Sequence, residues 1–457
     1  MNRDRAMANI ANQVAVVIGA GMGGLAAAGA LSDFFGRVIV LDRDKLPSEG
    51  VPRSGVPQGA HTHGLLIGGL RALQMLFPGI DEDFQAAGAV TIDAGRDFRW
   101  EQPGFDPFPA RTLGVPFCCL SRPAIEFSVR KRVGRLANVA LRDDCRAEEV
   151  VPTPDGRGVH GVRYSANGGE NGILTADLVI DASGRGVPTL DFLNATGRHA
   201  PAETVIGMNM NYVTAHFAVP RDAPDDWKAV ILLPKAPETS RGSILLPIEH
   251  GRWSVTMFGG HDDRPPNDDA GFLAFARGLR VLTVANALES AERVTPFSRF
   301  RFPGSSWRHF ESVADFPDGL LPLGDAECRF NPVFGQGMSV AAQEAVLLRR
   351  LLAGAEGDLT GLADAYFSEL PPVLEAPWAA ASLDLVYPQT EGERPPDFED
   401  QMRFFAALMA LAARDADVHS LVYEVTHLIK PRSVYREPAF QERVRAVLAE
   451  MTKTEAL

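Results

Sequence analysis

A glycine-rich turn between two apolar runs constrains this chain more than any other feature. Residues 19–24 read Gly-Ala-Gly-Met-Gly-Gly, after the apolar run 14–18 and before a stretch of small residues over 25–31. A second apolar run, 38–41, ends at Asp42. This order is typical of a β-α-β unit that binds a dinucleotide: a strand, a glycine turn, a helix, a second strand and an acid at its end.

Each residue of the motif has a physical task in such a unit. Gly19 would permit a tight turn, Gly21 would let a pyrophosphate approach the backbone, and Gly24 would let helix and strand pack closely. Free N–H groups at the start of the helix favour phosphate, and Asp42 can accept hydrogen bonds from a ribose. A glycine-rich turn in an ordinary β-α unit is the alternative. The motif alone leaves the choice between NAD and FAD open.

Composition narrows the class of protein. The chain has 457 residues, 46% of them hydrophobic and 23% charged, which suits an enzyme of two or three domains. A formal net charge of −13 argues against a nucleic-acid partner, because phosphate backbones need a basic surface. The cysteines lack metal-binding spacing, so we expect reduced thiols, no metal site and a cytoplasmic location. They are Cys118, Cys119, Cys145 and Cys328.

The amino-terminal region predicts neither a signal peptide nor a membrane span. Residues Met1–Gln13 are polar and lead directly into the first apolar run. Residues 14–31 are uncharged and could be mistaken for a membrane span, but their glycines occupy dinucleotide-fold positions. Ser32-Asp33 then follows at once.

The first half of the chain predicts a mixture of helices and short strands. We expect a helix from about Thr62 to Phe77, irregular strands over 89–118, and short strands over 138–165. Ser121 is a suitable N-cap for a helix that runs through Val133. The apolar run 178–180 predicts a buried strand that ends at Asp181.

A β-rich region then interrupts this pattern. Alternation over 208–217, and the runs 244–246 and 253–258 around a turn at 249–251, predict antiparallel strands. A buried strand over 319–323 and a helix over 333–352 follow, and the last hundred residues are mainly helical. A nucleotide-binding unit thus opens the chain, is interrupted, and is completed near 319–352.

Three separated segments together resemble one family. They are the Gly19–Gly24 turn with Asp42, the segment Asp177–Pro188, and Gly324-Asp325-Ala326 with Asn331–Met338. The set resembles the FAD-dependent class A monooxygenases, the para-hydroxybenzoate hydroxylase superfamily. Two further segments, 53–63 and 246–256, resemble its branch of polyether-pathway polyketide epoxidases.

The resemblance implies an α/β fold: an FAD-binding Rossmann-like domain of the glutathione-reductase type, an inserted, mainly antiparallel β-sheet substrate domain, and a helical carboxyl-terminal region. The FAD-binding domain is expected over 1–88, 119–200 and 291–355. The substrate domain is expected over 89–118 and 201–290, and the helical region over 356–457.

The resemblance also implies a set of FAD-binding residues. They are Gly19, Gly21, Met22, Gly24, Asp42, Arg43, Arg53, Gln58, His61, Arg122, Ala147, Asp181, Gly324, Asp325, Pro332, Gly335, Gly337 and Met338. Asp325 would bind the ribityl chain, and the helix that begins near Gly335 would face the flavin edge where negative charge develops on reduction. The alternatives are a helix N-cap for Asp325 and surface salt bridges for Arg53 and Arg122.

Two further groups have competing interpretations. His61 and His63 could suggest metal ligands, but no third ligand accompanies them, so a structural histidine or a flavin-side loop contact is favoured. Alternating residues on one strand predict a substrate pocket, with ordinary core as the alternative. The pocket residues would be Met208, Met210, Tyr212, Phe258 and Phe330.

The function implied is that of a monooxygenase, an epoxidase or hydroxylase acting on an apolar polyketide-like or aromatic natural-product intermediate. In this family O₂ forms a flavin C4a-hydroperoxide, which transfers one oxygen atom, and the protein excludes water. Electrons would come from NAD(P)H, or from reduced flavin supplied by a separate reductase. No side chain is identified as a general acid or base, and the sequence does not indicate the oligomeric state.

Three other functions compete with this one. A flavin-dependent halogenase shares the fold, but its W-x-W-x-I-P motif is absent and no lysine lies between Lys45 and Lys131. A reductase of the geranylgeranyl-reductase type would turn over without O₂, and its aromatic-Trp-Phe-Pro motif is missing. A non-enzymatic flavin-binding scaffold would consume no O₂ in response to substrate.

Overall fold

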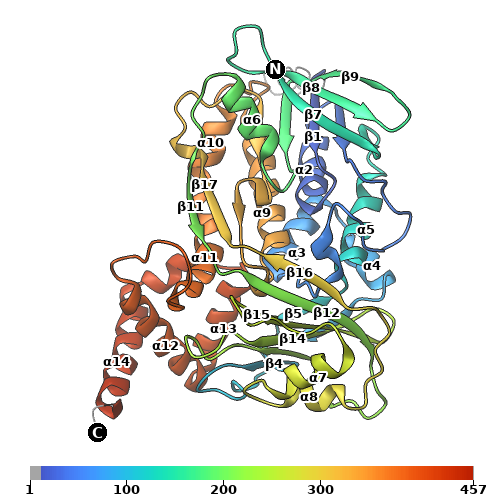
Figure 1. Cartoon of the computed structure of the whole chain (residues 1–457). Helices are drawn as coiled ribbons and strands as arrows, with labels where there is room; N and C mark the ends of the chain where they lie inside the picture. The colour runs from blue at the N-terminus through green and yellow to red at the C-terminus, as the bar shows by residue number, and fades with distance from the viewer. Residues whose placement is uncertain (1–11, 456–457) are drawn as a thin grey trace.

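The computed structural model describes residues 12–455 (Figure 1). Residues 1–11, which make up most of the segment where we expect no signal peptide, lie outside the described residues. Figure 1 shows the glycine turn and its parallel strands in one half of the molecule and a larger, mainly antiparallel sheet in the other. The last helices of the chain, α12 (Phe398–Arg414), α13 (Ala416–Thr426) and α14 (Pro438–Glu455), stand to one side of that sheet.

A five-stranded parallel sheet forms the centre of the first half. Its order is β18-β10-β1-β2-β6, and every neighbouring pair is parallel. The strands are β1 (Val14–Ile18), β2 (Arg37–Leu41), β6 (Val139–Arg142), β10 (Leu178–Asp181) and β18 (Leu320–Pro322). They come from three separated stretches of the chain, so the sheet is completed only near residue 320. This confirms the α/β fold class.

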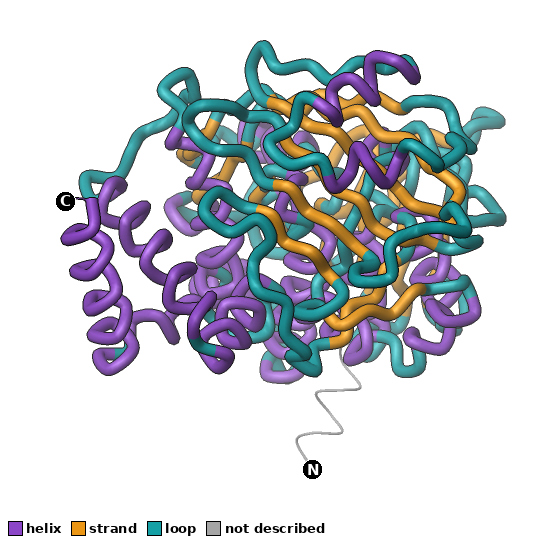
Figure 2. The backbone as a smooth tube through the Cα atoms, turned by 90° about the horizontal axis from the view of Figure 1, so that it is seen from below, coloured by secondary structure: helices purple, strands orange, loops and turns teal. Residues whose placement is uncertain are grey.

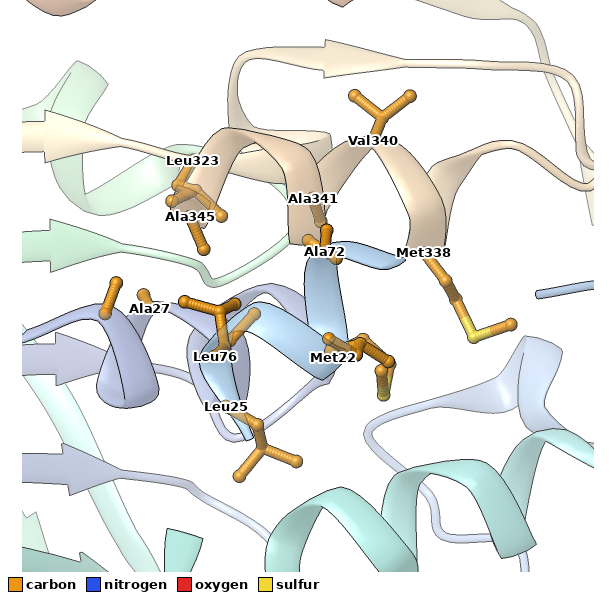
Figure 3. Packing of buried hydrophobic residues seen from close by; sticks show 14 of the residues in the cluster. Met22, Leu25, Ala27, Ala72, Leu76, Leu323, Met338, Val340, Ala341 and Ala345 are labelled. Carbon is orange, nitrogen blue, oxygen red and sulfur yellow. The ribbon is translucent and has the colours of Figure 1, made fainter. Parts of the chain in front are cut away.

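The helix α2 (Met22–Ser32) packs on the parallel sheet, and α3 (Ile67–Leu76) and α9 (Gly337–Gly354) pack against α2 and against each other. Figure 3 shows Ala72 and Leu76 of α3 beside Ala341 and Ala345 of α9, with Leu323 from the strand end close by. These side chains belong to the largest buried cluster. Small residues at the helix contacts let the backbones approach closely.

Further short elements surround this sheet. The other helices are α4 (Ile80–Ala86), α5 (Arg122–Val133) and α6 (Val187–Ala195). One small sheet pairs β3 (Val90–Asp93) with β5 (Pro116–Cys119), and another contains β7 (Cys145–Pro152), β8 (Val159–Ala166) and β9 (Asn171–Thr175). The Ser121 hydroxyl accepts a hydrogen bond from Ala124 N at 3.3 Å, which confirms the expected N-cap of α5.

The second half is built on a six-stranded sheet of order β16-β12-β15-β14-β13-β4. Its strands are β4 (Phe98–Glu101), β12 (Met210–Ala218), β13 (Ala229–Leu232), β14 (Gly242–Ile248), β15 (Arg252–Gly259) and β16 (Ser298–Phe302). Figure 2 shows these long strands side by side across the molecule as seen from below. His250 and Gly251 both have positive φ in the turn between β14 and β15, where the hairpin is expected.

The two faces of this sheet have different partners. Val213 and Val255 lie on the face that packs against α7 (Asp269–Arg277) and α8 (Thr283–Leu288), in a buried cluster of their own. Tyr212 and Phe258 are paired across β12 and β15 and belong to the opposite face, because side chains alternate along a strand. That opposite face is turned toward the parallel sheet.

The remaining elements connect the two halves and form the carboxyl-terminal region. A three-stranded sheet contains β11 (Ala202–Ile206), β17 (Ser305–His309) and β19 (Cys328–Arg329). The carboxyl-terminal helices are α10 (Leu362–Glu369), α11 (Pro371–Ala381), α12 (Phe398–Arg414), α13 (Ala416–Thr426) and α14 (Pro438–Glu455). Short 3₁₀ turns are η1 (Pro57–Ala60), η2 (Phe310–Ser312), η3 (Gly324–Ala326), η4 (Pro332–Phe334), η5 (Ser382–Val386) and η6 (Arg432–Arg436). Over residues 12–455, no helix has the length and apolar character that crossing a membrane requires.

Two helices are shorter at their starts than the sequence predicts. The helix expected from Thr62 begins only at Ile67, because the preceding residues are extended and Thr62 bonds to the large sheet. The helix expected from Val333 begins at Gly337, because Gly335 adopts a left-handed conformation with φ of +66°. Both differences lie where the chain passes between the two halves.

Candidate functional site

The glycine turn after β1 is closed on two sides and open on the third. Gly19 has φ of +103°, and a Cβ there would lie 2.6 Å from Ala182 O. A Cβ at Gly24 would lie 1.8 Å from Gly19 O, so this glycine is needed for the close contact of helix and turn. A Cβ at Gly21 would meet nothing within 4 Å. The open side lies at the first turn of α2, where free N–H groups attract phosphate.

Asp42 closes β2 beside this turn, as the sequence predicts. Its carboxylate accepts hydrogen bonds from Ala20 N at 2.7 Å and from Asp44 N at 2.9 Å. Arg53 donates to the same group at 3.1 Å. Asp42 therefore fixes the glycine turn to β2, and its Oδ2, which accepts from Ala20 N alone, can accept a further hydrogen bond from a ribose hydroxyl.

Arg53 and Arg122 lie in one buried ion-pair network rather than in surface salt bridges. Arg53 donates to Glu126 at 2.8 Å and to Asp44 at 2.8 Å, and Arg122 donates to Glu126 at 2.8 Å. Burial alone would lower the pKa of Arg53, but the carboxylates of Glu126 and Asp42 raise it above its ordinary value. The Nε of Arg122 is buried without a hydrogen-bond partner among the described residues.

Asp325 lies in η3 next to the first turn of α9. A Cβ at Gly337 would lie 3.7 Å from Asp325 Oδ1, which brings the two motif segments together. Burial raises the pKa of Asp325, although Arg329 and Arg122 oppose the rise. The first turn of α9 contains no acid of its own, and Asp325 is the carboxylate that lies beside it.

The loop that carries His61 approaches this helix start. A Cβ at Gly335 would lie 3.8 Å from Gly64 N, and Ser339 Oγ accepts from Leu66 N at 3.0 Å. His61 turns its Nδ1 to Thr214 Oγ1 at 2.7 Å, on the large sheet. Burial lowers the pKa of His61 to about 4, so the ring is neutral near pH 7.

His61 begins a chain of hydroxyl groups along the large sheet. Thr214 Oγ1 lies 2.6 Å from Thr256 Oγ1, which donates to Thr62 Oγ1 at 2.8 Å. Thr62 continues the chain to Ser254 at 2.8 Å. His61 thus joins the loop to the sheet through its side chain.

Within residues 12–455 no group of three His, Cys, Asp or Glu side chains is placed to hold a metal ion.

The carboxylate of Asp181 makes its hydrogen bonds within the protein. It accepts from Ser183 N, Thr189 N and Thr189 Oγ1 and is fully buried, so the side chain supports the turn before α6. Met22 and Met338 are buried side chains of the main core, and Figure 3 shows Met22 near Leu76 of α3 and Met338 extending from the start of α9. Only their backbone N–H groups are available to a cofactor.

Other expected FAD-binding residues flank the same region. Cys145 N donates to Asp42 O at 2.8 Å, which places the start of β7, and with it Ala147, near the end of β2. Arg43 is exposed next to Asp42, and Gln58 lies half-buried in η1. Gly324 and Pro332 belong to the turns η3 and η4 before α9.

An apolar cluster occupies the large-sheet face that is turned toward these loops. It consists of Met208, Met210, Tyr212, Phe258, Phe302, Val333 and Tyr387, all buried. Four of the five expected pocket residues belong to it. Phe330 does not, because its side chain packs into the main core instead. A cavity of about 310 Å³ lies elsewhere, between α3 and α13, and is not lined by this cluster.

Sequence reasoning missed two polar residues at this cluster. Asn331 is buried beside Tyr212, and Asp384 of η5 is buried beside Asn331. Asn331 could have been found as a polar residue before Pro332 in the motif segment. Asp384 has no sequence signal, because it comes from a helical stretch far from every motif.

FAD fits what these residues leave open. The space in front of Gly21 suits a pyrophosphate, and the unpartnered Nε of Arg122 can donate to a ligand. Gln336 Oε1 is also buried without a partner among the described residues, at the start of α9. Asp325 lies beside that helix start. The residues that would hold FAD therefore come from all three motif segments.

Comparison with known proteins gives the same ligand. A family model described as an FAD binding domain matches residues 12–376. Protein Rv3254 of Mycobacterium tuberculosis is 33% identical over 354 residues, which are 76% of this chain and 74% of that protein.

Solved structures share the fold along nearly the whole chain. The flavin-dependent brominase Bmp2 superposes with a TM-score of 0.67 at 17% identity, over 97% of this chain and 99% of that one. The p-nitrophenol 4-monooxygenase PnpA from Pseudomonas putida DLL-E4 gives 0.63 at 18% identity, over 92% of this chain and 100% of that one.

Proposed function

Because the chain belongs to the FAD binding domain family, we propose that it is a class A flavoprotein monooxygenase, which inserts one atom of O₂ into an apolar small molecule. The substrate would be a polyketide-like or aromatic natural-product intermediate. Epoxidation and hydroxylation both fit this chemistry. The resemblance of segments 53–63 and 246–256 to polyketide epoxidases supports epoxidation, which stays a prediction.

The observation that carries the proposal is the apolar cluster on the large sheet. Three of its side chains are each at most 5% exposed: Met210, Tyr212 and Phe258. They lie on the sheet face that is turned toward the loops before α9. A site lined this way excludes water, and oxygen transfer to an apolar substrate requires that exclusion. The opposite face of the same strands is ordinary core against α7 and α8.

The residues of the proposed FAD site divide the work of binding. Asp42 would accept from the adenosine ribose, the open turn at Gly21 would receive the pyrophosphate, and Asp325 would accept from the ribityl chain. The start of α9 would favour negative charge on the reduced ring system. When bound, FAD supplies the electron-transfer and O₂ chemistry.

The electron donor and the location follow as proposals from the same features. The chain has one dinucleotide motif, and FAD would occupy it. NAD(P)H would therefore bind transiently, or a separate reductase would supply reduced flavin. All four cysteines are buried free thiols, which supports a reducing, cytoplasmic location.

The test is a search for oxygenation by the purified, FAD-loaded protein. We expect a yellow protein that consumes NAD(P)H or reduced flavin and O₂ when supplied with candidate intermediates. The product should be heavier than the substrate by one oxygen atom, as measured by mass spectrometry with ¹⁸O₂. Substrate conversion that continues without O₂ would instead identify a reductase of the geranylgeranyl-reductase type.

A halogenase is the second candidate, because the brominase Bmp2 shares the fold over nearly the whole chain. The W-x-W-x-I-P motif is absent from the sequence, whose tryptophans stand alone at 100, 227, 253, 307 and 378. The same assay run with and without chloride or bromide separates the two. Halide-dependent product would overturn the monooxygenase proposal.

A further inference from the structure

Three buried polar groups form a chain from the apolar cluster to the carboxyl-terminal region. The Tyr212 hydroxyl donates to Asn331 Oδ1 at 2.5 Å, and Asn331 Nδ2 donates to Asp384 Oδ2 at 2.7 Å. Asn331 is 1% exposed, and Tyr212 and Asp384 are buried as well. None of these contacts is part of a helix or sheet ladder, so this series of hydrogen bonds depends on the three side chains alone.

The orientation of the Asn331 amide depends on both neighbours. Its Oδ1 also accepts from Val333 N at 3.1 Å, so the oxygen has two donors and the nitrogen has one acceptor. Rotating the amide by half a turn would set its NH₂ against Val333 N–H and its oxygen against the carboxylate of Asp384. A buried donor that faces a donor, or a buried acceptor that faces a carboxylate, costs free energy, so an ionised Asp384 fixes one orientation of the amide.

Asn331 joins the two sides of the proposed active site. It caps η4, which continues through the left-handed Gly335 to the first turn of α9. Through Tyr212 it is also bonded to β12 of the large sheet. Asp384 comes from η5, beyond residue 376 where the family match ends. The carboxyl-terminal region thus reaches the loop that faces the proposed flavin.

We infer that Asp384 is a positioning residue, which acts through the Asn331 amide to hold the Tyr212 hydroxyl and the loop 332–336 against each other at the FAD site. The inference rests on the proposed function for its view of that loop as the flavin-facing one. The position of the three side chains does not depend on it.

The ionisation of Asp384 adds a signature to this role. Burial raises the pKa of Asp384 to about 7, and the hydrogen bond from Asn331 offsets part of the rise. Tyr212 and Tyr387 are the titratable groups that interact with its charge, and Asp263 acts on Tyr387 in turn. Above pH 7 the carboxylate accepts only and fixes the amide. Below it, the carboxylic acid can donate, and the constraint is weaker.

The experiment is a double-mutant cycle on FAD binding with a pH series. Asp384→Ala and Tyr212→Phe are each expected to raise the FAD dissociation constant at pH 8 by about fivefold. The FAD dissociation constant of the double variant should not exceed that of the single variant that binds FAD more weakly, because both changes break the same series of hydrogen bonds. The absorption spectrum of bound FAD should show a one-proton transition near pH 7 in the wild type, and Asp384→Asn should abolish it.

Asp263→Asn is the matched control, because it removes a nearby carboxylate that bonds to Ser240 and Arg241 instead. It should keep the transition. The inference would be overturned if the fold-changes in the FAD dissociation constant for Asp384→Ala and Tyr212→Phe multiply in the double variant. It would also be overturned if the pH transition persists in Asp384→Asn. If Asp384→Ala does not fold, the isosteric Asp384→Asn still decides it through the pH series.

Failure of the proposed function would look different. A wild-type protein that binds no FAD refutes that proposal, and the cycle is then measured as melting temperatures of the FAD-free chain. Non-additive shifts for Asp384→Ala and Tyr212→Phe would still support the positioning role. Additive shifts would contradict it.

Discussion

An added methyl group has opposite consequences at two glycines of one turn. At Gly24 it would overlap Gly19 O, whereas at Gly21 it meets nothing within 4 Å. Gly21→Ala is therefore expected to fold normally but to bind FAD at least about tenfold more weakly, roughly 1.4 kcal/mol, because the methyl fills the space of the pyrophosphate. Titration of the FAD-free protein with FAD, followed by flavin fluorescence, measures this.

Gly354→Ala is the control for Gly21→Ala. Gly354 is the last residue of α9, and a Cβ there also meets nothing within 4 Å. This variant should keep the wild-type affinity and gain slightly in stability, since alanine favours helix. Equal affinities for Gly21→Ala and Gly354→Ala would show that no pyrophosphate binds at the turn.

Glu344 gives a pH-dependent prediction. It is fully buried in α9, accepts from Gly324 N at 2.5 Å, and has a pKa raised by burial to about 7. The folded chain therefore keeps a proton between about pH 4 and 7 that the unfolded chain releases. The stability linked to that proton is present below about pH 4 and is lost as the pH rises through 7.

Glu344→Gln removes this titration and can still accept from Gly324 N. From pH 5 to pH 8, its free energy of unfolding should rise relative to wild type by about 2 kcal/mol, as measured by urea denaturation. Glu369→Gln, an exposed carboxyl paired with Arg350, should leave the pH dependence unchanged. A constant difference between Glu344→Gln and wild type across this range would contradict the prediction.

At the scale of elements, the two faces of β15 predict different consequences for adjacent residues. Phe258 belongs to the apolar cluster, and Met257 to the core beneath α7 and α8. Both side chains are at most 1% exposed. Phe258→Ala and Met257→Ala should therefore each lower the free energy of unfolding by about 3 kcal/mol through loss of buried contacts.

Only Phe258→Ala should also admit solvent to the flavin. Iodide quenching of bound-flavin fluorescence should increase in this variant and stay at the wild-type level in Met257→Ala. Equal quenching in the two variants would place the flavin away from the apolar cluster. The comparison needs no substrate, so it tests the placement of the site independently of turnover.

The elements that the sequence predicts well are those whose pattern is local. The glycine turn, the Ser121 cap and the 249–251 hairpin follow from residue type and spacing, and the structure contains all three. The starts of α3 and α9 were misplaced because long-range contacts override local helix propensity. Thr62 bonds to β15, and Gly335 approaches Gly64 from the other half of the site.

The candidate site shows the same division. Gly21, Asp42 and Asp325 could be placed from motifs, because each follows a buried strand at a known spacing. Asp181 fits the motif equally well, yet its carboxylate is consumed by the turn before α6. Asp384 could not be predicted, because only the folded chain brings η5 to Asn331.

For the whole molecule, the last three helices lie beyond the family match. That match ends at residue 376, and α12, α13 and α14 follow with a buried cluster of their own. Phe108 of the substrate half belongs to this cluster, and Arg111 bonds nearby to the last turn of α12. These contacts join the helices to the rest of the chain.

Arg111 is expected to be the main polar link in this docking. Its guanidinium donates to Ala412 O at 3.1 Å and to Ala413 O, and lies 3.0 Å from His419 Nδ1. Carbonyls at the carboxyl end of a helix lack partners within the helix, and a cation there also interacts favourably with the negative end of the helix dipole. Arg111→Ala should therefore lower the free energy of unfolding of α12 and α13 by about 1–2 kcal/mol.

Hydrogen–deuterium exchange separates this local loosening from global unfolding. Exchange should rise about fivefold or more in α12 and α13 of Arg111→Ala, while β1 and α2 stay protected. Arg403→Ala is the control, because Arg403 lies on α12 but its side chain is 62% exposed and pairs, within residues 12–455, with the neighbouring acids Glu399 and Asp400 at 3.6 Å. Since η5 lies between the family-matched region and these helices, Arg111→Ala should also weaken FAD binding slightly through Asp384. Faster exchange in α12 and α13 with unchanged FAD affinity would show that the helices dock independently of the site.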